Sequence, residues 1–426
     1  MRPTLFHWQK PSADTLVEIF AGGKQVALDA SDTGAGKTYV ALDTVSRLRR
    51  PFLIICPKSV KTAWTRTAEQ FGVTPIGIIT PQRLLYKNPY YKNQEWDLPD
   101  NAMILWDEIQ QGTAGENTKT TVALGRTKVY RVPVLAMSAT IADSPLKMRG
   151  LGFLLGLHDF NKSSFKRWCL AHGCYPSPFA YGKLEFSKAQ RGRDAIAGIH
   201  EDIKSSMVRI KREDIPDFPE GHVIARLVDL DDKYAEEIDK LYKDLDERLK
   251  HPSCNELVAR GQAREKTECL KVPAFVDLIT DALAEGTSPV MFLNYHSSRE
   301  ALAEALAEIG INNVSQIHGR QNEEERARGI DLFQDNTNHV CIVMTQAGGA
   351  GVSLHDLNGR PRVSFITPSD KAIDMVQCLG RIHRVGGSKV VQTFILAAGT
   401  VEEKVYNNVQ RKLYNISLLN DGDLAI

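Results

Sequence analysis

The stretch "SDTGAGKT", residues 31–38, is close to the phosphate-loop pattern G-x-x-x-x-G-K-[ST], with Ser31 in place of the first glycine. An apolar run, residues 24–30, precedes it and a segment with helical spacing follows, which is the strand–loop–helix context that the pattern requires. In such a loop, backbone N–H groups and a helix N-terminus hold phosphate oxygens. The stretch therefore predicts a nucleotide site within a parallel α/β sheet.

Individual residues of the loop have predicted roles. Gly34 and Gly36 would let the backbone approach the phosphates closely, because glycine has no Cβ. Lys37 is expected to reach the β- and γ-phosphates of ATP, and the Thr38 hydroxyl to bind Mg²⁺. The full set of loop residues predicted to bind the nucleotide is Thr33, Gly34, Ala35, Gly36, Lys37 and Thr38.

An acidic pair ends another apolar run, "AMILWDEIQ", residues 102–110. Side chains at the carboxyl end of a strand in a parallel sheet lie where ligands bind. We expect Asp107 to hold Mg²⁺ and Glu108 to act as general base toward the attacking water. An acidic pair in an ordinary loop is the alternative, and the apolar strand before it argues against that reading.

Short apolar runs recur in two series, which indicates strands alternating with helices. The runs cover residues 24–30, 51–57, 76–80, 102–108 and 132–138, and then 288–295, 314–319, 339–345, 362–367 and 389–397. Between the series, residues of about 141–270 are richer in charge and in helical spacing, as in 234–250. The predicted fold class is α/β, two parallel-sheet lobes with a helical insertion between them. We expect a first lobe at 1–228 with the insertion at about 141–220, a helical linker at 229–270 and a second lobe at 271–426.

Composition excludes several classes of protein. The 53 basic and 52 acidic residues leave a net charge of +1, so a nucleic-acid partner would have to bind at a local cleft. No run approaches 18 uncharged apolar residues, and the start "MRPTLFHWQK" lacks an apolar signal core, which predicts a soluble intracellular protein without a membrane partner. The cytoplasm of a bacterial or infected cell is the expected location.

Seven cysteines are scattered singly through the chain. "CLAHGC", residues 169–174, suggests a zinc site, but a closed zinc site needs about four ligands and no second Cys/His pair lies nearby. Reduced thiols in a helical region are the favoured interpretation.

Three further stretches, with the loop and the acidic pair, resemble the motifs of superfamily 2 helicases. They are "MSATI" (137–141), "TQAGGAGVSLHDL" (345–357) and "QCLGRIHRVGG" (377–387). In that family the loop often reads [A/S]-x-T-G-x-G-K-T, which accommodates Ser31, and "DEIQ" (107–110) is a variant of its DExx box. The resemblance implies two RecA-like lobes that hydrolyse ATP with Mg²⁺.

The second-half motifs carry further predicted nucleotide contacts. By this resemblance Arg381 and Arg384 are arginine fingers for the γ-phosphate, since a guanidinium can stabilise the charge on the transferring phosphoryl group. Gln377 and Gly351 are expected near the nucleotide. Two arginines on a solvated helix face are the alternative, which Gln377 and Gly380 at the motif's spacing argue against.

Several other segments resemble the Swi2/Snf2-like branch of the superfamily, so that the resemblance covers about residues 6–405. They are "CPKSVKTAWTRTAEQF" (56–71) and the stretches at 144–169, 205–223, 317–334 and 380–387. Two forms depart from the branch: Gln110 stands where it usually has His, and "SAT" (138–140) where it usually has T-G-T-P. Both resemble other superfamily 2 helicases, so strand unwinding is possible beside duplex translocation. A compact phage or bacterial member is expected.

The resemblance also suggests contacts outside the phosphate site. In "LFHWQKP" (5–11), Gln9 would read the adenine edge and Phe6 would stack on it. Expected DNA contacts, which would position the strand without reading its sequence, are Lys58, Ser59, Thr80, Arg83, His296, Arg320 and Thr345.

The predicted function is that of an ATP-dependent DNA helicase or translocase that remodels or unwinds forked, branched or duplex DNA, with single strands as a further possible track. An RNA helicase and a catalytically silent nucleic-acid-binding scaffold are the alternatives. A small-molecule P-loop kinase would leave the second α/β series unexplained.

Overall fold

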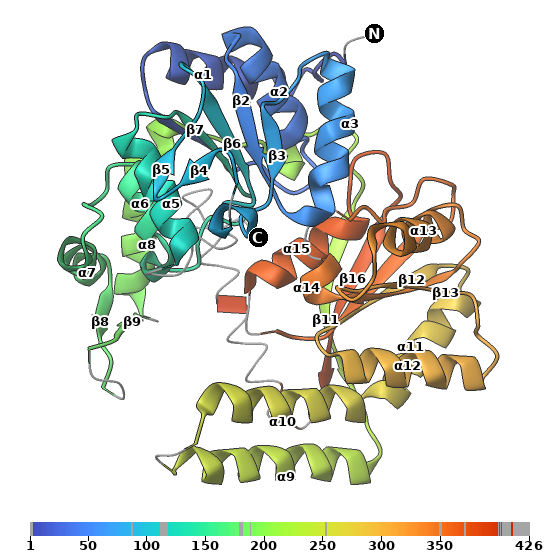
Figure 1. The fold of residues 1–426 in the computed structure, drawn as a ribbon. Helices are drawn as coiled ribbons and strands as arrows, with labels where there is room; N and C mark the ends of the chain where they lie inside the picture. Colours follow the sequence, from blue (N-terminus) through green and yellow to red (C-terminus); the bar gives the residue numbers. More distant parts are fainter. Residues whose placement is uncertain are drawn as a thin grey trace. The chain divides into compact units, whose positions relative to one another are not determined.

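The computed structural model describes residues 3–86, 88–110, 118–178, 182–187, 189–251, 254–348, 352–369, 372–398, 400, 402 and 410–411. The described chain divides into two compact units, residues 3–216 and 217–411 (Figure 1). In the described part of the chain, every helix is too short or too polar to cross a membrane.

The first unit is built on a six-stranded sheet in the order β10-β1-β7-β6-β2-β3, with every ladder parallel. Its strands are β1 (Val26–Asp29), β2 (Phe52–Ile55), β3 (Gly77–Ile79), β6 (Met103–Asp107), β7 (Val134–Met137) and β10 (Met207–Val208). Strands β1, β2, β6 and β7 are buried along their whole length, as expected for a parallel sheet covered by helices on both faces. The five strands predicted in the first half of the sequence are confirmed.

Helices and two small hairpins complete this unit. The helices are α1 (Lys10–Ala21), α2 (Lys37–Leu48), α3 (Lys61–Phe71), α5 (Lys119–Val129), α6 (Arg149–Leu154), α7 (Lys162–Ala171) and α8 (Gln190–Ile203). The hairpins pair β4 (Tyr91–Lys92) with β5 (Glu95–Trp96), and β8 (Cys174–Pro176) with β9 (Leu184–Phe186). The core of the unit packs around Trp106, which is fully buried on β6.

The second unit holds another six-stranded parallel sheet, in the order β11-β16-β15-β12-β14-β13. Its strands are β11 (Gly221–Val228), β12 (Ser288–Leu293), β13 (Val314–Ile317), β14 (Val340–Met344), β15 (Arg362–Ile366) and β16 (Val390–Ala397). Its helices are α9 (Asp232–Leu249), α10 (Glu256–Leu270), α11 (Val272–Ala284), α12 (His296–Glu308), α13 (Glu323–Gln334), α14 (Thr345–Gly348) and α15 (Ala372–Ile382). The predicted class, two RecA-like parallel-sheet lobes, is confirmed.

The central region is less uniformly helical than its charge pattern suggests. The two-residue strand β10 joins the first sheet beside β1, and β11 joins the second sheet beside β16. The predicted first lobe, 1–228, thus includes a strand that pairs in the second sheet. Strand β11 is exposed along most of its length, and its apolar residues at 223–228, interrupted by Arg226, were not among the predicted strands.

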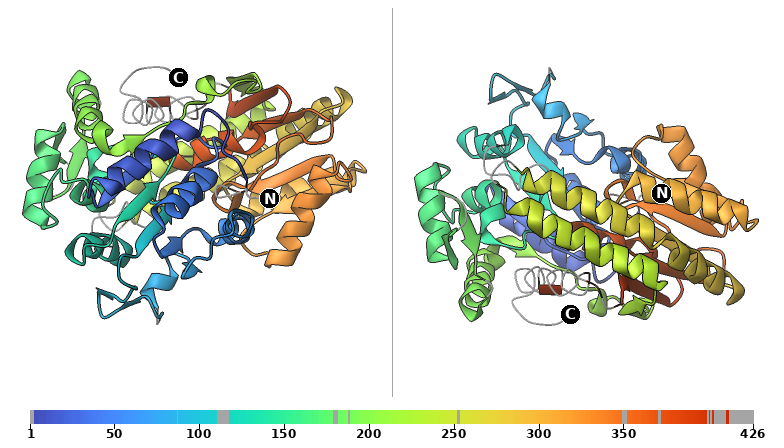
Figure 2. Two further views of the ribbon diagram at one scale, coloured as in Figure 1. Left: turned by 90° about the horizontal axis from the view of Figure 1, so that it is seen from above. Right: turned by 90° about the horizontal axis from the view of Figure 1, so that it is seen from below.

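The predicted helix at residues 234–250 is present as α9, which buries Ile238 and Leu245. It lies alongside α10 as an antiparallel pair, seen from below in Figure 2. Most of its charged residues face solvent, as the periodicity predicts.

Candidate nucleotide-binding site

The phosphate loop runs from the end of β1 to the start of α2, and two of its glycines are required by geometry. Gly34 and Gly36 have φ angles of 88° and 90°, in the left-handed region that side chains rarely adopt. A Cβ at Gly36 would lie 2.1 Å from Nε2 of Gln9. The loop can therefore keep this path only with glycine at these positions.

Lys37 lies over the loop that it follows. Its Nζ donates to the carbonyl oxygens of Ser31 at 2.7 Å and Asp32 at 3.1 Å. Thr38, the second residue of α2, is half-buried beside it. An ammonium group and the first N–H groups of a helix thus meet at one place, which is an arrangement suited to phosphate.

The acidic pair stands at the same edge of the sheet as the loop. Asp29 at the end of β1 and Asp107 at the end of β6 are both in register with Met137 on β7, which lies between them. The positive charge of Lys37 lowers the pKa of both carboxyl groups, although burial outweighs it and leaves each pKa raised. The structure therefore brings Lys37, which directly precedes Thr38 on α2, into the electrostatic neighbourhood of Asp107, and the roles of these residues stay predictions.

Asp107 is held by two hydrogen bonds. The Trp64 indole Nε1 donates to Oδ2 at 2.9 Å, and the Glu108 backbone N–H donates to Oδ1 at 3.0 Å. Burial, with the Glu108 carboxylate beside it, raises the pKa of Asp107 to about 6. The carboxyl group is thus oriented and poised to ionise near neutral pH.

Gln110 connects the acidic box with the "SAT" segment. Its Nε2 donates to Glu108 Oε2 at 2.5 Å and reaches Thr140 Oγ1 at 3.4 Å. Glu108 itself has a φ of 49°, which is unusual for a residue with a side chain. The position at which this chain departs from the branch pattern is therefore the one that orients Glu108.

Gln9 is fixed between the N-terminal turn and the phosphate loop. Its Nε2 donates to the Ala35 carbonyl oxygen at 3.0 Å, and its Oε1 accepts from the Phe6 N–H at 3.0 Å. The Phe6 ring is 55% exposed and stacks on Trp8 with a centroid distance of 4.4 Å. Thus Gln9 contacts the phosphate loop, while Phe6 is exposed to solvent.

Sequence reasoning missed the segment that follows β10, because only the structure places it against the phosphate loop. The Asp32 N–H donates to the Ile210 carbonyl oxygen at 3.0 Å, and Arg209 forms an ion pair with Asp32 at 3.1 Å. Arg212 donates from Nη2 to Thr33 Oγ1 at 2.6 Å, and burial lowers its pKa. The resemblance of residues 205–223 to a branch signature was the available signal, but it assigned these arginines no role.

In the second unit, the two predicted finger arginines share one acceptor. Arg381 Nη1 and Arg384 Nη2 donate to the Val352 carbonyl oxygen at 3.3 and 3.1 Å. Gln377 lies on α15 together with Arg381 and is buried, whereas Arg384 follows the end of that helix. Gly351, predicted to lie near the nucleotide, is outside the described residues.

The expected DNA contacts follow strand ends. In the first unit these are η1 (Lys58–Val60), after β2, and the residues after β3; in the second they follow β12, β13 and β14. The predicted residues are Lys58, Ser59, Thr80, Arg83, His296, Arg320 and Thr345. Thr345 is 1% exposed, and its hydroxyl donates to the carbonyl oxygen of Leu293 at the end of β12 at 3.0 Å. This hydroxyl is therefore used in a hydrogen bond within the second unit.

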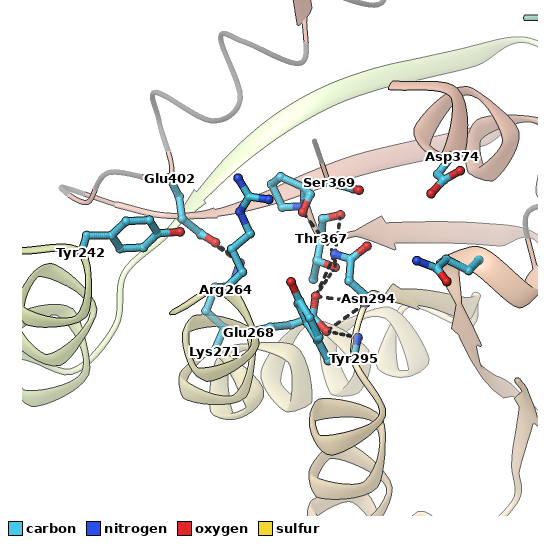
Figure 3. Close-up of a pocket in the computed structure, with 12 residues that line it drawn as sticks. Tyr242, Arg264, Glu268, Lys271, Asn294, Tyr295, Thr367, Ser369, Asp374 and Glu402 are labelled. Carbon is cyan, nitrogen blue, oxygen red and sulfur yellow. Dashed lines mark hydrogen bonds and ion pairs between the residues drawn. The ribbon is translucent and has the colours of Figure 1, made fainter. Parts of the chain in front are cut away.

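A polar cavity of about 170 Å³ lies in the second unit at the carboxyl ends of β12 and β15 (Figure 3). The Glu268 carboxylate accepts from the N–H groups of Asn294 and Tyr295 at 2.9 and 3.0 Å. Lys271 forms an ion pair with Glu402 at 2.7 Å beside it. These polar groups are paired with one another, which braces this edge of the sheet.

The zinc alternative finds no support in the described part of the chain. Cys169 and Cys174 are buried, and no three His, Cys, Asp or Glu side chains are grouped there so that they could hold a metal ion.

Comparison with known proteins finds helicases among the relatives of this chain. The family model "Helicase conserved C-terminal domain" matches residues 271–386. The "Putative ATP-dependent RNA helicase L364" of Acanthamoeba polyphaga mimivirus is 32% identical over 462 residues, which cover 99% of this chain and 84% of that protein.

More distant relatives match nearly the whole chain as well. A Caenorhabditis elegans protein named "SWI/SNF-related matrix-associated actin-dependent regulator of chromatin subfamily A-like protein 1 homolog" is 23% identical, with 90% of this chain and 58% of that protein covered. Among solved structures, the Sulfolobus solfataricus SWI2/SNF2 ATPase core in complex with dsDNA is 18% identical with a TM-score of 0.41, covering 99% of this chain and 94% of that one.

Proposed function

The chain belongs to the superfamily 2 helicases of the Swi2/Snf2-like branch, and from this premise we propose that it is an ATP-driven DNA motor. In this proposal it translocates on duplex or forked DNA and remodels or unwinds it. The observation that carries the proposal is the placement of Lys37 and Asp107 at one edge of the first sheet.

The residues at this edge fit a magnesium nucleotide. The loop has glycine where a Cβ would collide with Gln9, and its lysine ammonium is held by two carbonyl oxygens that a phosphate would displace. Thr38 and Asp107 supply the hard oxygen ligands that Mg²⁺ prefers. When bound, Mg²⁺ would neutralise charge on the phosphates during transfer.

The roles that we propose for the protein groups follow from their contacts. Lys37 and the loop N–H groups of residues 33–38 bind the phosphates, and Glu108, oriented by Gln110, takes the proton of the attacking water. Gln9 and Phe6 would bind the adenine.

Arg381 and Arg384 are proposed to stabilise the negative charge of the phosphoryl group during its transfer. Gln377 and Gly351 are proposed to lie near the nucleotide as well. Both guanidinium groups bind the Val352 carbonyl oxygen, within the segment that resembles the Gly-rich motif of lobe two. A movement of the arginines toward phosphate would therefore also move this segment, which supports a coupling between hydrolysis and grip on DNA.

DNA is favoured over RNA by the Swi2/Snf2-like segments along the chain, and a relative of that branch matches 90% of it. The second candidate, an RNA helicase, is favoured by the name of the mimivirus relative and by the DEIQ and SAT forms. We propose duplex, forked or branched DNA as the partner.

The test is steady-state ATP hydrolysis with no nucleic acid, single-stranded DNA, duplex DNA, forked DNA and RNA, with Glu108→Gln as the inactive control. Strong stimulation by duplex or forked DNA is expected, and it should vanish in the variant. Stimulation by RNA alone would mean that the protein acts on RNA and not on DNA. No hydrolysis under any of these conditions would favour a non-catalytic scaffold.

A further inference from the structure

We propose that the basic insertion, residues 162–193, which runs from α7 through the β8–β9 hairpin to the first turn of α8, carries a second surface for the nucleic-acid backbone. This surface is separate from the loops that follow the strands of the sheet. The inference rests on the proposed function for the identity of the polyanion, and it adds a contact that the helicase motifs do not contain.

Charge is concentrated in this insertion. The chain as a whole carries +1, yet residues 162–193 contain seven lysines and arginines and a single acidic residue, Glu185. The remainder of the chain is therefore net acidic. A local basic patch on a nearly neutral chain is the electrostatic mark of a polyanion site.

The cations of the insertion are available to a partner. The exposed ones that the structure describes are Lys162, Lys166, Arg167, Lys183 and Arg191. Within the described ranges none of these five forms an ion pair, in contrast to Arg47 and Lys147 of the same unit. They would bind an anion without first breaking an internal pair.

Glu185, the single carboxylate of residues 162–193, does not neutralise them, and the next one, Asp194, accepts a hydrogen bond from Gln190 Nε2 at 2.7 Å. Glu185 on β9 lies opposite Tyr175 on β8, and it accepts hydrogen bonds from the Tyr175 hydroxyl at 3.1 Å and from Ser177 Oγ at 2.5 Å. The hydroxyls thus occupy both carboxylate oxygens. The Tyr175 ring remains 38% exposed, on the same hairpin that carries Lys183.

The two helices place three of these cations near one another. Phe165, Trp168 and Cys169 of α7 face the core, which leaves Lys162 and Lys166, one turn apart, on the outer side. Arg191 at the start of α8 reaches the last turn of α7, since its Nη2 donates to the Leu170 carbonyl oxygen at 3.4 Å. In Figure 1, α7 and the hairpin stand at the edge of the first unit that is remote from α3.

A nucleic-acid backbone fits this surface better than an acidic protein segment does. Charges at one-turn intervals match a partner whose negative charges repeat regularly along its length, and such contacts need no sequence readout. Lysine and arginine beside an exposed aromatic ring are the combination that nucleic-acid grooves use.

The test compares full-length K162Q/K166Q with the matched variant K240Q/K243Q, which removes two exposed lysines from the acidic helix α9. The equilibrium binding of labelled duplex DNA is measured as a function of NaCl concentration, without nucleotide. Since each phosphate contact adds about 0.9 to the slope of log K against log salt, we expect the slope of K162Q/K166Q to fall by about 1.8. The slope of K240Q/K243Q should stay within about 0.5 of that of the wild type.

A second variant, K183Q/R191Q, tests the hairpin and α8 in the same way, and thermal melting checks that each variant folds. The expected result is weaker DNA binding with basal ATP hydrolysis unchanged. Wild-type affinity and slope in both insertion variants would overturn the inference while leaving the motor intact. A wild-type protein that binds DNA through these lysines but is never stimulated by it would instead sink the proposed function alone. Binding of anionic lipid vesicles in place of DNA would overturn the inference.

Discussion

Trp64 on α3 donates its indole N–H to Asp107 at the end of β6, over 2.9 Å. Trp64 is 1% exposed, so this hydrogen bond lies in the protein interior, where competition from water is small. It connects the helix after β2 with the carboxyl group that we propose as the Mg²⁺ ligand. Because it favours the ionised form, it lowers the pKa of Asp107 against the effect of burial.

Replacing Trp64 with Phe keeps an aromatic ring but removes the donor. We expect the Mg²⁺ concentration needed for half-maximal hydrolysis to rise by about tenfold, since a hydrogen bond to a charged group is worth about 1.5 kcal/mol. The acidic limb of the pH–rate profile should also move to higher pH. Magnesium titrations at fixed ATP measure the first effect.

Trp106→Phe is the matched control for that substitution. Trp106 is also fully buried, on β6 itself, and its indole N–H has no acceptor within the part of the chain that the structure describes. Equal magnesium requirements in the two variants would contradict a positioning role for the Trp64 hydrogen bond.

The raised pKa of Asp107 predicts opposite effects of pH on activity and on stability. Its pKa of about 6 lies above the ordinary value of 3.8, so the charged form that binds Mg²⁺ is lost as the pH falls through about 6. Folding, in contrast, favours the neutral carboxyl group. The destabilisation caused by this group is absent below pH 3.8 and is complete above about pH 6.

Asp107→Asn should therefore abolish hydrolysis and raise the melting temperature by a few degrees at pH 8, where the wild-type carboxylate is buried and charged. The difference in melting temperature should shrink as the pH is lowered toward 4. Paired thermal melts across this range check the sign. A variant less stable than the wild type at pH 8 would show that the hydrogen bonds of the carboxylate outweigh its burial.

Arg212→Lys tests the hydrogen bond by which Arg212 holds the phosphate loop. Lysine keeps the charge but cannot reproduce the hydrogen bond from the guanidinium group to Thr33 Oγ1, so the phosphate loop should become less ordered. We expect KM for ATP to rise by about tenfold with kcat less affected, because Arg212 contacts the loop and not the reacting atoms. Arg226→Lys, on the exposed strand β11, is the control. A fall in kcat alone would instead indicate that Arg212 touches the phosphates during transfer.

Gln110→Ala and Thr140→Val each remove one end of the bridge between the acidic box and the "SAT" segment. If the bridge transmits nucleic-acid binding to Glu108, both variants should lose stimulation by DNA. Thr140→Val should keep basal hydrolysis, whereas Gln110→Ala should also lower it, because Gln110 orients Glu108. The double variant should be no worse than Gln110→Ala alone, because Thr140 acts through Gln110. Additive losses would show that the two residues act independently.

Much of the fold could be predicted from local patterns. Each of the ten predicted strands is an apolar run long enough to be recognised by itself, and the loop at residues 31–38 is set by glycines that local backbone geometry requires. The two-residue strand β10 is too short for such a run, and β11 has apolar residues that remain exposed, so burial does not mark it as a strand. Their places in the sheets depend on partners far away in the sequence.

For the candidate site, the sequence by itself determined which chemical groups are present: the lysine and hydroxyl after the glycines, and the carboxylates after an apolar strand. Only the tertiary structure decided how they are held. Trp64 on Asp107 and Arg212 on Thr33 join residues that no periodicity connects. The physical reason is that periodicity reports the burial of a side chain against its immediate neighbours. A hydrogen bond between distant segments exists only after the sheet has set the register that places Asp29 and Asp107 beside one strand.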